Sequence, residues 1–154
     1  LTILSTNCMS QTDFDKKIKS LLNETVPLMG QAELREKINN NEVLILDSRT
    51  QKEYETSHIE SAIFVDYDNF SEEMVAELDK EKSVVVYCSV GYRSEKIGEK
   101  LQKFGFKEVY NLYGGIFDWK NNGGEVVNKS GVTDSVHTYN KKWSQWLING
   151  IRVY

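Results

Sequence analysis

The pattern of hydrophobic and polar residues predicts a chain in which strands and helices alternate. Four short apolar runs, rich in β-branched residues, lie about twenty residues apart and are nearly continuous. Continuous hydrophobicity of this kind is typical of a strand whose sheet is covered by helices on both faces. The alternation with helices further indicates a parallel sheet with right-handed crossovers. The predicted strands are residues 43–46, 62–65, 84–87 and 109–112.

The segments between the predicted strands have the apolar spacing of amphipathic helices. One helix is predicted behind Ser71, a candidate N-cap, and another ends at Gly105, a residue typical of helix stops. The apolar faces of these two helices are formed by Phe70, Met74 and Leu78, and by Ile97, Leu101 and Phe104.

Helical patterns also occur near the two ends of the chain. Thr12 and Asp15 resemble a capping box for a short amphipathic helix over residues 14–22, which we expect to cover the edge of the main domain. A second helix is predicted over residues 31–39. Apolar residues of the tail fall near one helical stripe, which most often marks core contacts, with a surface facing a partner or a membrane as the alternative. These tail residues are Tyr139, Trp143, Trp146, Leu147 and Ile151.

Length and composition describe an ordinary globular domain. The 154 residues are enough for one domain whose core needs no disulfide or metal. The 40% hydrophobic and 27% charged residues exclude a disordered or collagen-like chain, and no apolar run reaches the roughly 18 residues of a transmembrane span. Two cysteines, Cys8 and Cys88, are too few for a disulfide framework or a four-thiolate zinc site, so no metal is predicted.

The net charge of −4 is unevenly distributed. Residues 1–125 carry 15 Lys and Arg against 22 Asp and Glu, a charge of −7, whereas residues 126–154 carry 4 against 1, a charge of +3. An acidic body is a poor nucleic-acid binder, so no nucleic-acid partner is predicted. The apolar stretch that ends at Cys8 resembles the trimmed remnant of an export signal. A frayed terminus explains it as simply, so a cytoplasmic protein is favoured, with an exported or periplasmic one as the alternative.

The main chemical signal is the segment that begins at Cys88, which follows the predicted strand 84–87 and leads into a helix. Open parallel sheets place their chemistry at the carboxyl ends of their strands. Backbone N–H groups of a tight loop converge there, and the helix presents its positive end. Gly91 permits the torsions of such a loop, and Arg93 adds a positive charge. These effects favour a thiolate, so Cys88 is predicted to be a nucleophile rather than a buried hydrophobe.

This segment, Cys88-Ser89-Val90-Gly91-Tyr92-Arg93-Ser94, resembles the active-site loop of the rhodanese family of single-domain sulfurtransferases. Two further signatures of that family have counterparts here in the right order. They are Leu46-Asp47-Ser48-Arg49, Glu53-Tyr54, His58-Ile59 and Ser61-Ala62 before the loop, and Gly105-Phe106, Val109, Leu112, Gly114-Gly115-Ile116 and Trp119 after it. Ser57 and Ser61 stand where the family usually has glycines, so the resemblance does not define the exact backbone of that turn, whereas the cysteine loop is unaffected.

The resemblance covers residues 27–125 and divides the chain into three parts. Residues 1–26 form an N-terminal extension with a short amphipathic helix, residues 27–125 form the rhodanese domain, and residues 126–154 form a C-terminal aromatic extension that packs on it. The fold implied by the resemblance is a three-layer α/β structure. Its central sheet is mostly parallel, has five strands and is flanked by helices.

The resemblance also implies sulfur transfer through a persulfide on Cys88, without a metal or an organic cofactor. The thiolate would take the outer sulfur of a small anionic donor such as thiosulfate, and a thiol, cyanide or a protein acceptor would then remove it. Tyr92 is expected to point outward, where it could shape the choice of acceptor. The implied substrate-binding residues are Ser89, Val90, Gly91, Tyr92 and Arg93, which would help to hold the anion. Asp47 and Arg49 would be supports, with a direct contact of Arg49 to the donor as the alternative.

Other functions compete with sulfur transfer. Phosphatases and arsenate reductases of the related fold have five residues between cysteine and arginine, whereas four separate Cys88 from Arg93, which favours a sulfur atom over a phosphate. A non-catalytic rhodanese-like binding or regulatory module is the alternative from another class, although such modules usually lack the cysteine. A histidine-paired cysteine protease is unsupported. His58 lies in a turn signature, where a structural role is expected, and His137 lies in the tail, where we expect it to be solvated.

Overall fold

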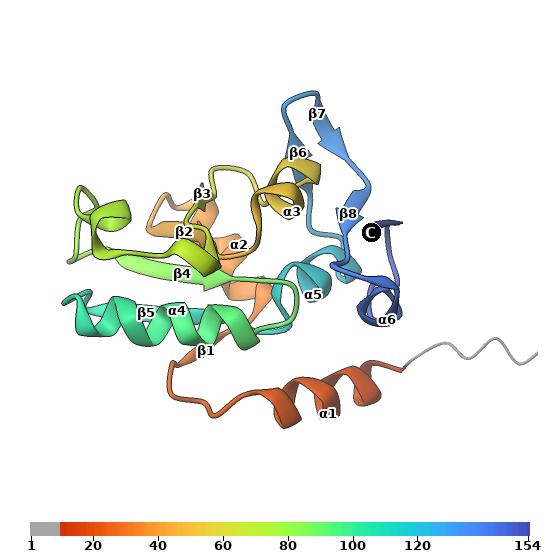
Figure 1. The fold of residues 1–154 in the computed structure, drawn as a ribbon, viewed down its shortest axis with the longest axis horizontal. Helices are drawn as coiled ribbons and strands as arrows, with labels where there is room; N and C mark the ends of the chain where they lie inside the picture. The colour runs from red at the N-terminus through yellow and green to blue at the C-terminus, as the bar shows by residue number, and fades with distance from the viewer. Residues whose placement is uncertain (1–9) are drawn as a thin grey trace, which may run out of the picture.

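A five-stranded parallel β-sheet forms the centre of the molecule, with the strand order β1-β5-β4-β2-β3 (Figure 1). The structure is a computed structural model that describes residues 10–154, and the expectation for Cys8 lies outside them. All four predicted strands are present, and the α/β fold with a five-stranded sheet is confirmed. The strand that the hydrophobic pattern missed, β1, has only two residues. The strands are β1 (Leu28–Met29), β2 (Val43–Asp47), β3 (Ile63–Phe64), β4 (Ser83–Tyr87) and β5 (Glu108–Leu112).

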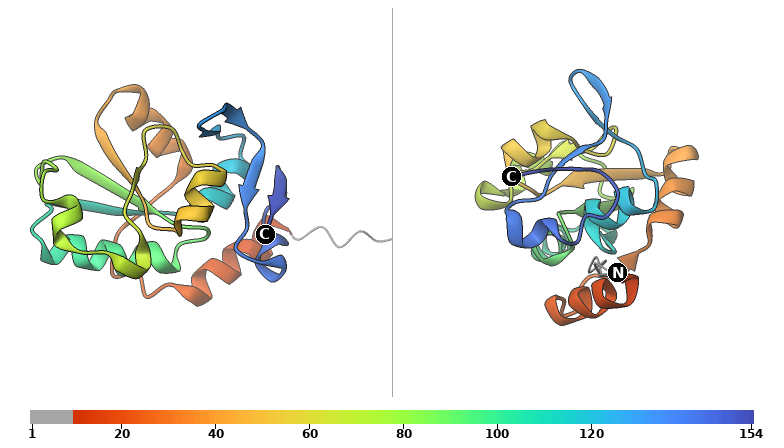
Figure 2. Two further views of the ribbon diagram at one scale, coloured as in Figure 1. Left: turned by 45° about the horizontal axis from the view of Figure 1, so that its top comes forward. Right: turned by 90° about the vertical axis from the view of Figure 1, so that its right-hand side faces the viewer.

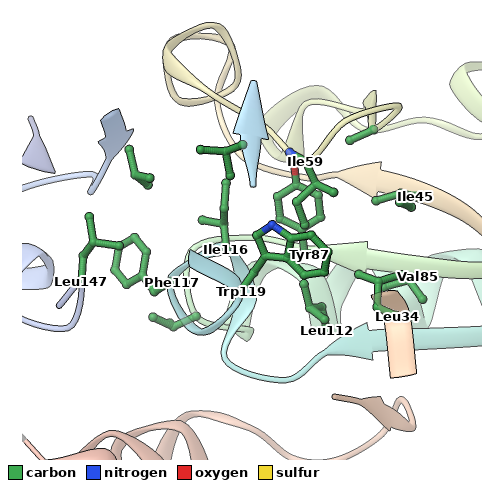
Figure 3. Close-up of a cluster of buried hydrophobic side chains, with 14 of the residues drawn as sticks. Leu34, Ile45, Ile59, Val85, Tyr87, Leu112, Ile116, Phe117, Trp119 and Leu147 are labelled. Atoms are coloured by element: carbon green, nitrogen blue, oxygen red, sulfur yellow. Dashed lines mark hydrogen bonds between the residues drawn. The ribbon is translucent and has the colours of Figure 1, made fainter. Parts of the chain in front are cut away.

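The apolar runs are continuous because both faces of the sheet are buried. In β4, Val84 and Val86 contribute to the core on one face, while Val85 and Tyr87 contribute to the core on the other. None of these four side chains has exposed surface. Figure 3 shows the cluster that contains Val85 and Tyr87. A shift of the strand by one residue would exchange the two sets of side chains, so burial of both faces favours one register.

Helices cover both faces of the sheet. Leu34 of α2 and Ile116 and Phe117 of α5 are buried in the cluster around Tyr87. On the opposite face, α4 buries Ile97 and Leu101. The predicted helices over 31–39 and before Gly105 are therefore confirmed. The helices around the sheet are α2 (Gln31–Asn39), α3 (Gln51–Thr56), α4 (Tyr92–Lys103) and α5 (Gly115–Asn121).

The segment between β3 and β4 does not form the predicted helix. It contains two short 3₁₀ turns, η1 (Tyr67–Asn69) and η2 (Glu72–Val75), and the side chain of Ser71 makes no capping hydrogen bond. Val75 is fully buried, whereas Met74 is exposed. The prediction was wrong because a 3₁₀ turn has three residues per turn, so its inward-facing positions differ from those of an α-helical stripe.

The C-terminal tail is mostly extended, and the predicted helical stripe is wrong. Its only helix among the described residues is α6 (Lys141–Ser144), and two pairs of short strands surround it. Trp146 and Leu147 are buried in the core cluster, whereas Tyr139 and Ile151 are exposed. Turns separate these apolar residues along the chain, so their helical spacing in the sequence does not place them on one face. The strands are β6 (Val126–Asn128) with β7 (Gly131–Thr133), which are antiparallel, and β8 (Ser135–His137) with β9 (Ile151–Val153), which are parallel.

The N-terminal helix α1 (Gln11–Leu21) packs against this tail. Its N-cap is Ser10, whose hydroxyl accepts a hydrogen bond from the backbone N–H of Asp13, so the cap predicted at Thr12 is wrong by two residues. Phe14 is buried, and its ring stacks on Trp146 with the ring centroids 5.5 Å apart. Figure 2 shows α1 close to the C-terminal segment in both views. Within residues 10–154, no helix has the length and apolar character needed to cross a membrane.

Trp146→Ala should lower the free energy of unfolding by about 3 kcal/mol, because it leaves a cavity between α1 and the main core. Urea unfolding followed by circular dichroism measures this loss. Tyr154 is exposed, so Tyr154→Ala serves as the control and should change the free energy by less than about 0.5 kcal/mol. Equal stability of the two variants would contradict a shared core.

Candidate active site

Cys88 is the first residue after β4 and lies at the carboxyl edge of the sheet. Its side chain is almost fully buried, and its Sγ atom accepts a hydrogen bond from the N–H of Gly91 at 3.1 Å. Gly91 has a φ of +132°, which residues with a Cβ rarely adopt, and it is the N-cap of the twelve-residue helix α4. The sulfur therefore lies at the positive end of a helix, where a negative charge is stabilised.

The loop after Cys88 presents several further backbone N–H groups. Within the described part of the chain, the amides of Val90, Tyr92, Arg93 and Ser94 donate no hydrogen bond to a protein atom. Successive free amides in a tight turn form an anion-binding concavity. These groups can therefore stabilise an anionic atom attached to Cys88.

The first turn of α5 holds the loop in place. The N–H of Ile116 donates to the carbonyl of Cys88 at 2.9 Å, and the N–H of Phe117 donates to the carbonyl of Ser89 at 3.2 Å. A Cβ atom at Gly115 would collide with the carbonyl oxygen of Cys88, so this close approach requires glycine.

Two buried polar side chains support the loop from the neighbouring strand and helix. The Oγ atom of Ser94 lies 2.6 Å from Oδ1 of Asn111 and 3.4 Å from Sγ of Cys88. The amide nitrogen of Asn111 donates to the carbonyl of Gly91 at 3.0 Å. Because the Ser94 hydroxyl has a single proton, it donates to one of three acceptors: Oδ1 of Asn111, the carbonyl of Gly91 at 3.1 Å, or the sulfur.

Arg93 forms an ion pair with Glu53. Each terminal nitrogen of Arg93 lies 2.9 Å from a carboxylate oxygen of Glu53, and Nη2 also donates to the Ser89 hydroxyl at 3.0 Å. Burial raises the pKa of Glu53, but the hydrogen bonds and charge of Arg93 outweigh this effect and lower the pKa to about 2. Glu53 also completes a capping box with Thr50 at the start of α3. One carboxylate therefore joins α3 to the cysteine loop.

A second buried ion pair lies at the end of the neighbouring strand β2. Nη2 of Arg49 lies 2.7 Å from Oδ2 of Asp47 and donates to the carbonyl of Ser57, also at 2.7 Å. The hydroxyl of Tyr87 donates to the same carboxylate at 2.6 Å and accepts a hydrogen bond from the N–H of Ile59. Asp47 and Arg49 have no exposed surface, so this network ties β2 to β4 without reaching solvent.

A pocket of about 430 Å³ opens over Cys88. The cysteine loop and the start of α4 line one side of it. The remaining walls come from the end of α1, from η1 and from the C-terminal tail, through Leu21, Tyr67, Asp68, Tyr139 and Trp143. Asp47 and Arg49 do not line this pocket.

The model of the rhodanese-like domain matches residues 30–122, more than half of the chain, and this match contains Cys88 and its loop. The chain belongs to the rhodanese-like domain family. Curated relatives include tRNA uridine(34) hydroxylases from Photorhabdus laumondii and Yersinia pestis, which are 39% and 37% identical to it over 92 residues. Each match covers 56% of this chain and 26% of the relative. The chain thus spans about a quarter of the length of these relatives.

Several solved structures share the fold of this chain. The BH2092 protein from Bacillus halodurans matches with a TM-score of 0.64 and 26% identity over 76% of this chain and 88% of that one. A rhodanese-like domain protein from Staphylococcus aureus has a TM-score of 0.59 and 26% identity, over 67% of this chain and 98% of that one. A thiosulfate sulfurtransferase from Pseudomonas aeruginosa has a TM-score of 0.62 at 23% identity, over 75% of this chain and 22% of that one, and shows likeness of fold alone.

The structure brings together the residues predicted from the rhodanese-like loop. Ser89, Val90, Tyr92 and Arg93 line the pocket with Cys88, and Gly91 donates its N–H to the sulfur. Tyr92 is exposed, as expected. His58 is a structural residue, since its Nδ1 atom lies 2.9 Å from the carbonyl oxygen of Tyr54 and its ring stacks on Tyr54. Among the described residues, no group of three or more His, Cys, Asp or Glu side chains could hold a metal ion.

The expectation that His137 is solvated is wrong. Only 6% of its surface is exposed, because β8 packs against α3 and pairs with β9. Its Nδ1 atom accepts a hydrogen bond from the N–H of Tyr139 at 3.0 Å. Burial lowers the pKa of His137, although the nearby charge of Glu53 opposes this. A neutral His137 therefore holds the backbone at Tyr139, in the segment that leads into α6.

Several residues of the site had no role assigned from sequence. Glu53 was only a signature residue, and its position three residues after Thr50 signals a capping box without revealing Arg93 as its partner. Asn111 carried no signal except as a polar residue in an apolar run. The tail residues Tyr139 and Trp143 were expected to be core residues. Trp143 packs against the core while Tyr139 is exposed, and both also line the pocket, which the sequence did not indicate.

Glu53→Gln should flatten the acid dependence of stability. The pKa of Glu53 is about 2 in the folded protein against an ordinary value of 4.5. Its ionised form therefore stabilises the fold above pH 4.5, by on the order of 3 kcal/mol, and this contribution is lost as the pH falls toward 2. Urea unfolding at several pH values should show that Glu53→Gln has a lower free energy of unfolding than wild type at neutral pH. This free energy should also decrease less steeply in the variant as the pH falls. Glu60 is exposed, so Glu60→Gln is the control and should show the pH dependence of the wild type. If the free energy of unfolding of Glu53→Gln depends on pH as steeply as that of wild type, this role of Glu53 is refuted.

Gly115→Ala should lower the free energy of unfolding by about 2 kcal/mol, because the added Cβ displaces the cysteine loop from α5. Gly30 has open space around it and a φ of −75°, so Gly30→Ala is the matched control and should have little effect. Thermal or urea unfolding compares the two. An unaltered Gly115→Ala variant would show that the close contact is not required.

Proposed function

We propose that this rhodanese-like protein is a sulfurtransferase that carries a sulfane sulfur as a persulfide on Cys88. The observation that carries the proposal is the position of the sulfur, which lies at an open pocket, accepts the N–H of Gly91 and is next to four described loop amides that donate to no protein atom. A second sulfur atom bonded to Sγ would be an anion surrounded by these amides. The loop therefore suits a persulfide as a stable intermediate.

The reaction has two steps with covalent catalysis. The Cys88 thiolate attacks the outer sulfur of a donor such as thiosulfate, a new S–S bond forms, and the S–S bond of the donor breaks. Sulfite leaves with the electron pair of that bond. An acceptor thiolate or cyanide then attacks the outer sulfur of the persulfide, and the Cys88 thiolate leaves. No metal or organic cofactor takes part in this sequence.

The surrounding residues have distinct parts in the proposal. The amides of residues 89–93 form the cradle, and the Ser94 hydroxyl is near enough to donate to the sulfur. Arg93 holds the loop through Glu53 and Ser89, and Asp47 and Arg49 support it from β2. A direct contact of Arg49 with the donor has no support, because its side chain is fully buried.

The ion pair of Arg93 also bears on the phosphatase alternative. A phosphate cradle needs an arginine whose guanidinium can bind the oxyanion in a bidentate manner. Here both terminal nitrogens of Arg93 are already bonded to Glu53. This arrangement favours a sulfur atom over a phosphate group, in agreement with the four-residue spacing.

The names of the curated relatives provide a second candidate function, a part in the modification of a tRNA uridine. The 39% identity over 92 residues favours it, whereas the net charge of −4 does not favour RNA binding. A gel-shift titration with tRNA at low and at physiological salt distinguishes specific tRNA binding from the weak, salt-sensitive binding expected without it. Specific retardation that persists at physiological salt would favour the tRNA candidate.

Incubation with excess thiosulfate should add the mass of one sulfur atom to the protein, and a thiol should remove it. Cys88→Ala should abolish both this gain and the formation of thiocyanate from thiosulfate and cyanide. Cys8→Ala is the matched control and should keep both. Intact-mass spectrometry and a thiocyanate assay make the two measurements. Sulfur transfer by Cys88→Ala at the wild-type rate would overturn the assignment, and a mass that never changes would favour a binding module.

A further inference from the structure

The pocket over Cys88 is completed by segments outside the part of the chain that matches the family. Leu21 is the last residue of α1, and Tyr139 and Trp143 belong to the C-terminal tail, whereas the family match covers residues 30–122. In Figure 1, α1 and α6 both lie toward the end of the sheet at which β4 ends. The reactive sulfur and half of the apolar and aromatic side chains that line the pocket thus come from different parts of the sequence.

The volume of the pocket fits an organic molecule. Its 430 Å³ falls within the range of roughly 300–1,000 Å³ that is typical of small-molecule sites. A small inorganic anion such as thiosulfate fills only about the space of three or four waters, on the order of 100 Å³. Most of the pocket would stay unfilled around such a donor.

The charges of the pocket do not favour a dianion. Arg93 is the single cationic side chain among the described residues that line it, and its charge is paired with Glu53. Asp68 adds a negative charge on another wall. A donor with two negative charges would therefore meet no unpaired cation, whereas a donor with one negative charge on its outer sulfur needs only the loop amides.

The backbone of the tail at Tyr139 is held in an uncommon conformation. Tyr139 has a φ of +70°, in a turn closed by the hydrogen bond from the N–H of Asn140 to the carbonyl of Thr138. A γ-turn of this kind is strained for a residue with a side chain, and His137 stabilises it by accepting the N–H of Tyr139. Tyr139 is 54% exposed, and its ring centroid lies 5.5 Å from Cζ of Arg93. Strained backbone conformations of this kind cluster at binding and active sites, and Tyr139 lines the pocket over Cys88.

Trp143 forms the neighbouring part of this wall. Its backbone N–H donates to Oδ1 of Asn140 at 3.0 Å, and Nζ of Lys17 lies 5.4 Å from its ring centroid. The first contact fixes the backbone of Trp143, and the ring is partly buried against the core cluster. With Tyr139, it offers flat apolar surface to a molecule whose sulfur reaches Cys88.

We infer that the tail selects organic sulfur compounds with a flat apolar body and at most one negative charge, and that Trp143 and Tyr139 determine this preference. The inference rests on the proposed function. With an aryl thiosulfonate, the Cys88 thiolate attacks the outer sulfur, and the S–S bond of the donor breaks. The aryl sulfinate leaves with the electron pair, and the Cys88 persulfide remains. The aryl group would lie against the two aromatic rings.

Two probes test the inference with the full chain: benzenethiosulfonate, which has a flat ring, and methanethiosulfonate, which has the same reacting group and charge without it. Persulfide formation is followed by intact mass, and the ratio of the two second-order rate constants is compared between proteins. The ratio should fall about tenfold in Trp143→Ala, as expected for the loss of one aromatic contact, and recover in Trp143→Phe. Tyr139→Ala, at an exposed position, should lower the ratio in the same direction.

Tyr154→Ala is the control, because Tyr154 is an exposed aromatic residue of the same tail that does not line the pocket. Its ratio should equal that of the wild type. If both probes add sulfur to Cys88 but the ratio is the same in every variant, the inference is overturned and the proposed function stands. If neither probe nor thiosulfate adds sulfur, the proposed function fails as well.

Discussion

The carboxylate of Glu53 is the constraint on which the arrangement of the site depends. It has no exposed surface and lies between the start of α3 and the cysteine loop, and it accepts hydrogen bonds from Thr50, Ser89 and Arg93. A buried carboxylate without these partners would be strongly destabilising, so the partners must be present together for the fold to form. Because it occupies both terminal nitrogens of Arg93, it leaves the backbone amides as the groups that face the sulfur. The chemistry of the loop is therefore set by a residue that does not touch Cys88.

Much of the fold and the centre of the site could be predicted, because local patterns determine them. The continuous runs at 43–46 and 84–87 reflect burial of both faces of a strand, and a thiol between a strand and a helix indicates a nucleophile. The partners within the site could not be predicted, because Glu53 and Arg93 are forty positions apart and meet only through the sheet. The same is true of Asn111, whose polar side chain lies in an apolar strand and becomes meaningful only beside Gly91.

The errors in the tail and around η2 have a common physical cause. In both segments, the spacing of apolar residues resembled one face of a helix, but short turns interrupt the chain between them. Such spacing indicates which residues would share a face if a helix formed, and it does not show that the helix forms. His137 is an error of a different kind: it was expected to be solvated, but the packing of β8 on α3 buries it. Local polarity does not predict such a contact.

The stack of Phe14 on Trp146 connects two segments that lie at opposite ends of the described chain. The same two segments place Leu21 and Trp143 in the pocket wall. Docking of α1 and occupancy of the pocket are therefore linked equilibria. A molecule that contacts both walls stabilises the docked helix, and by reciprocity the docked helix strengthens the binding of that molecule by the same free energy. The affinity of the pocket thus depends on a helix that is held in place partly by the distant stack of Phe14 on Trp146.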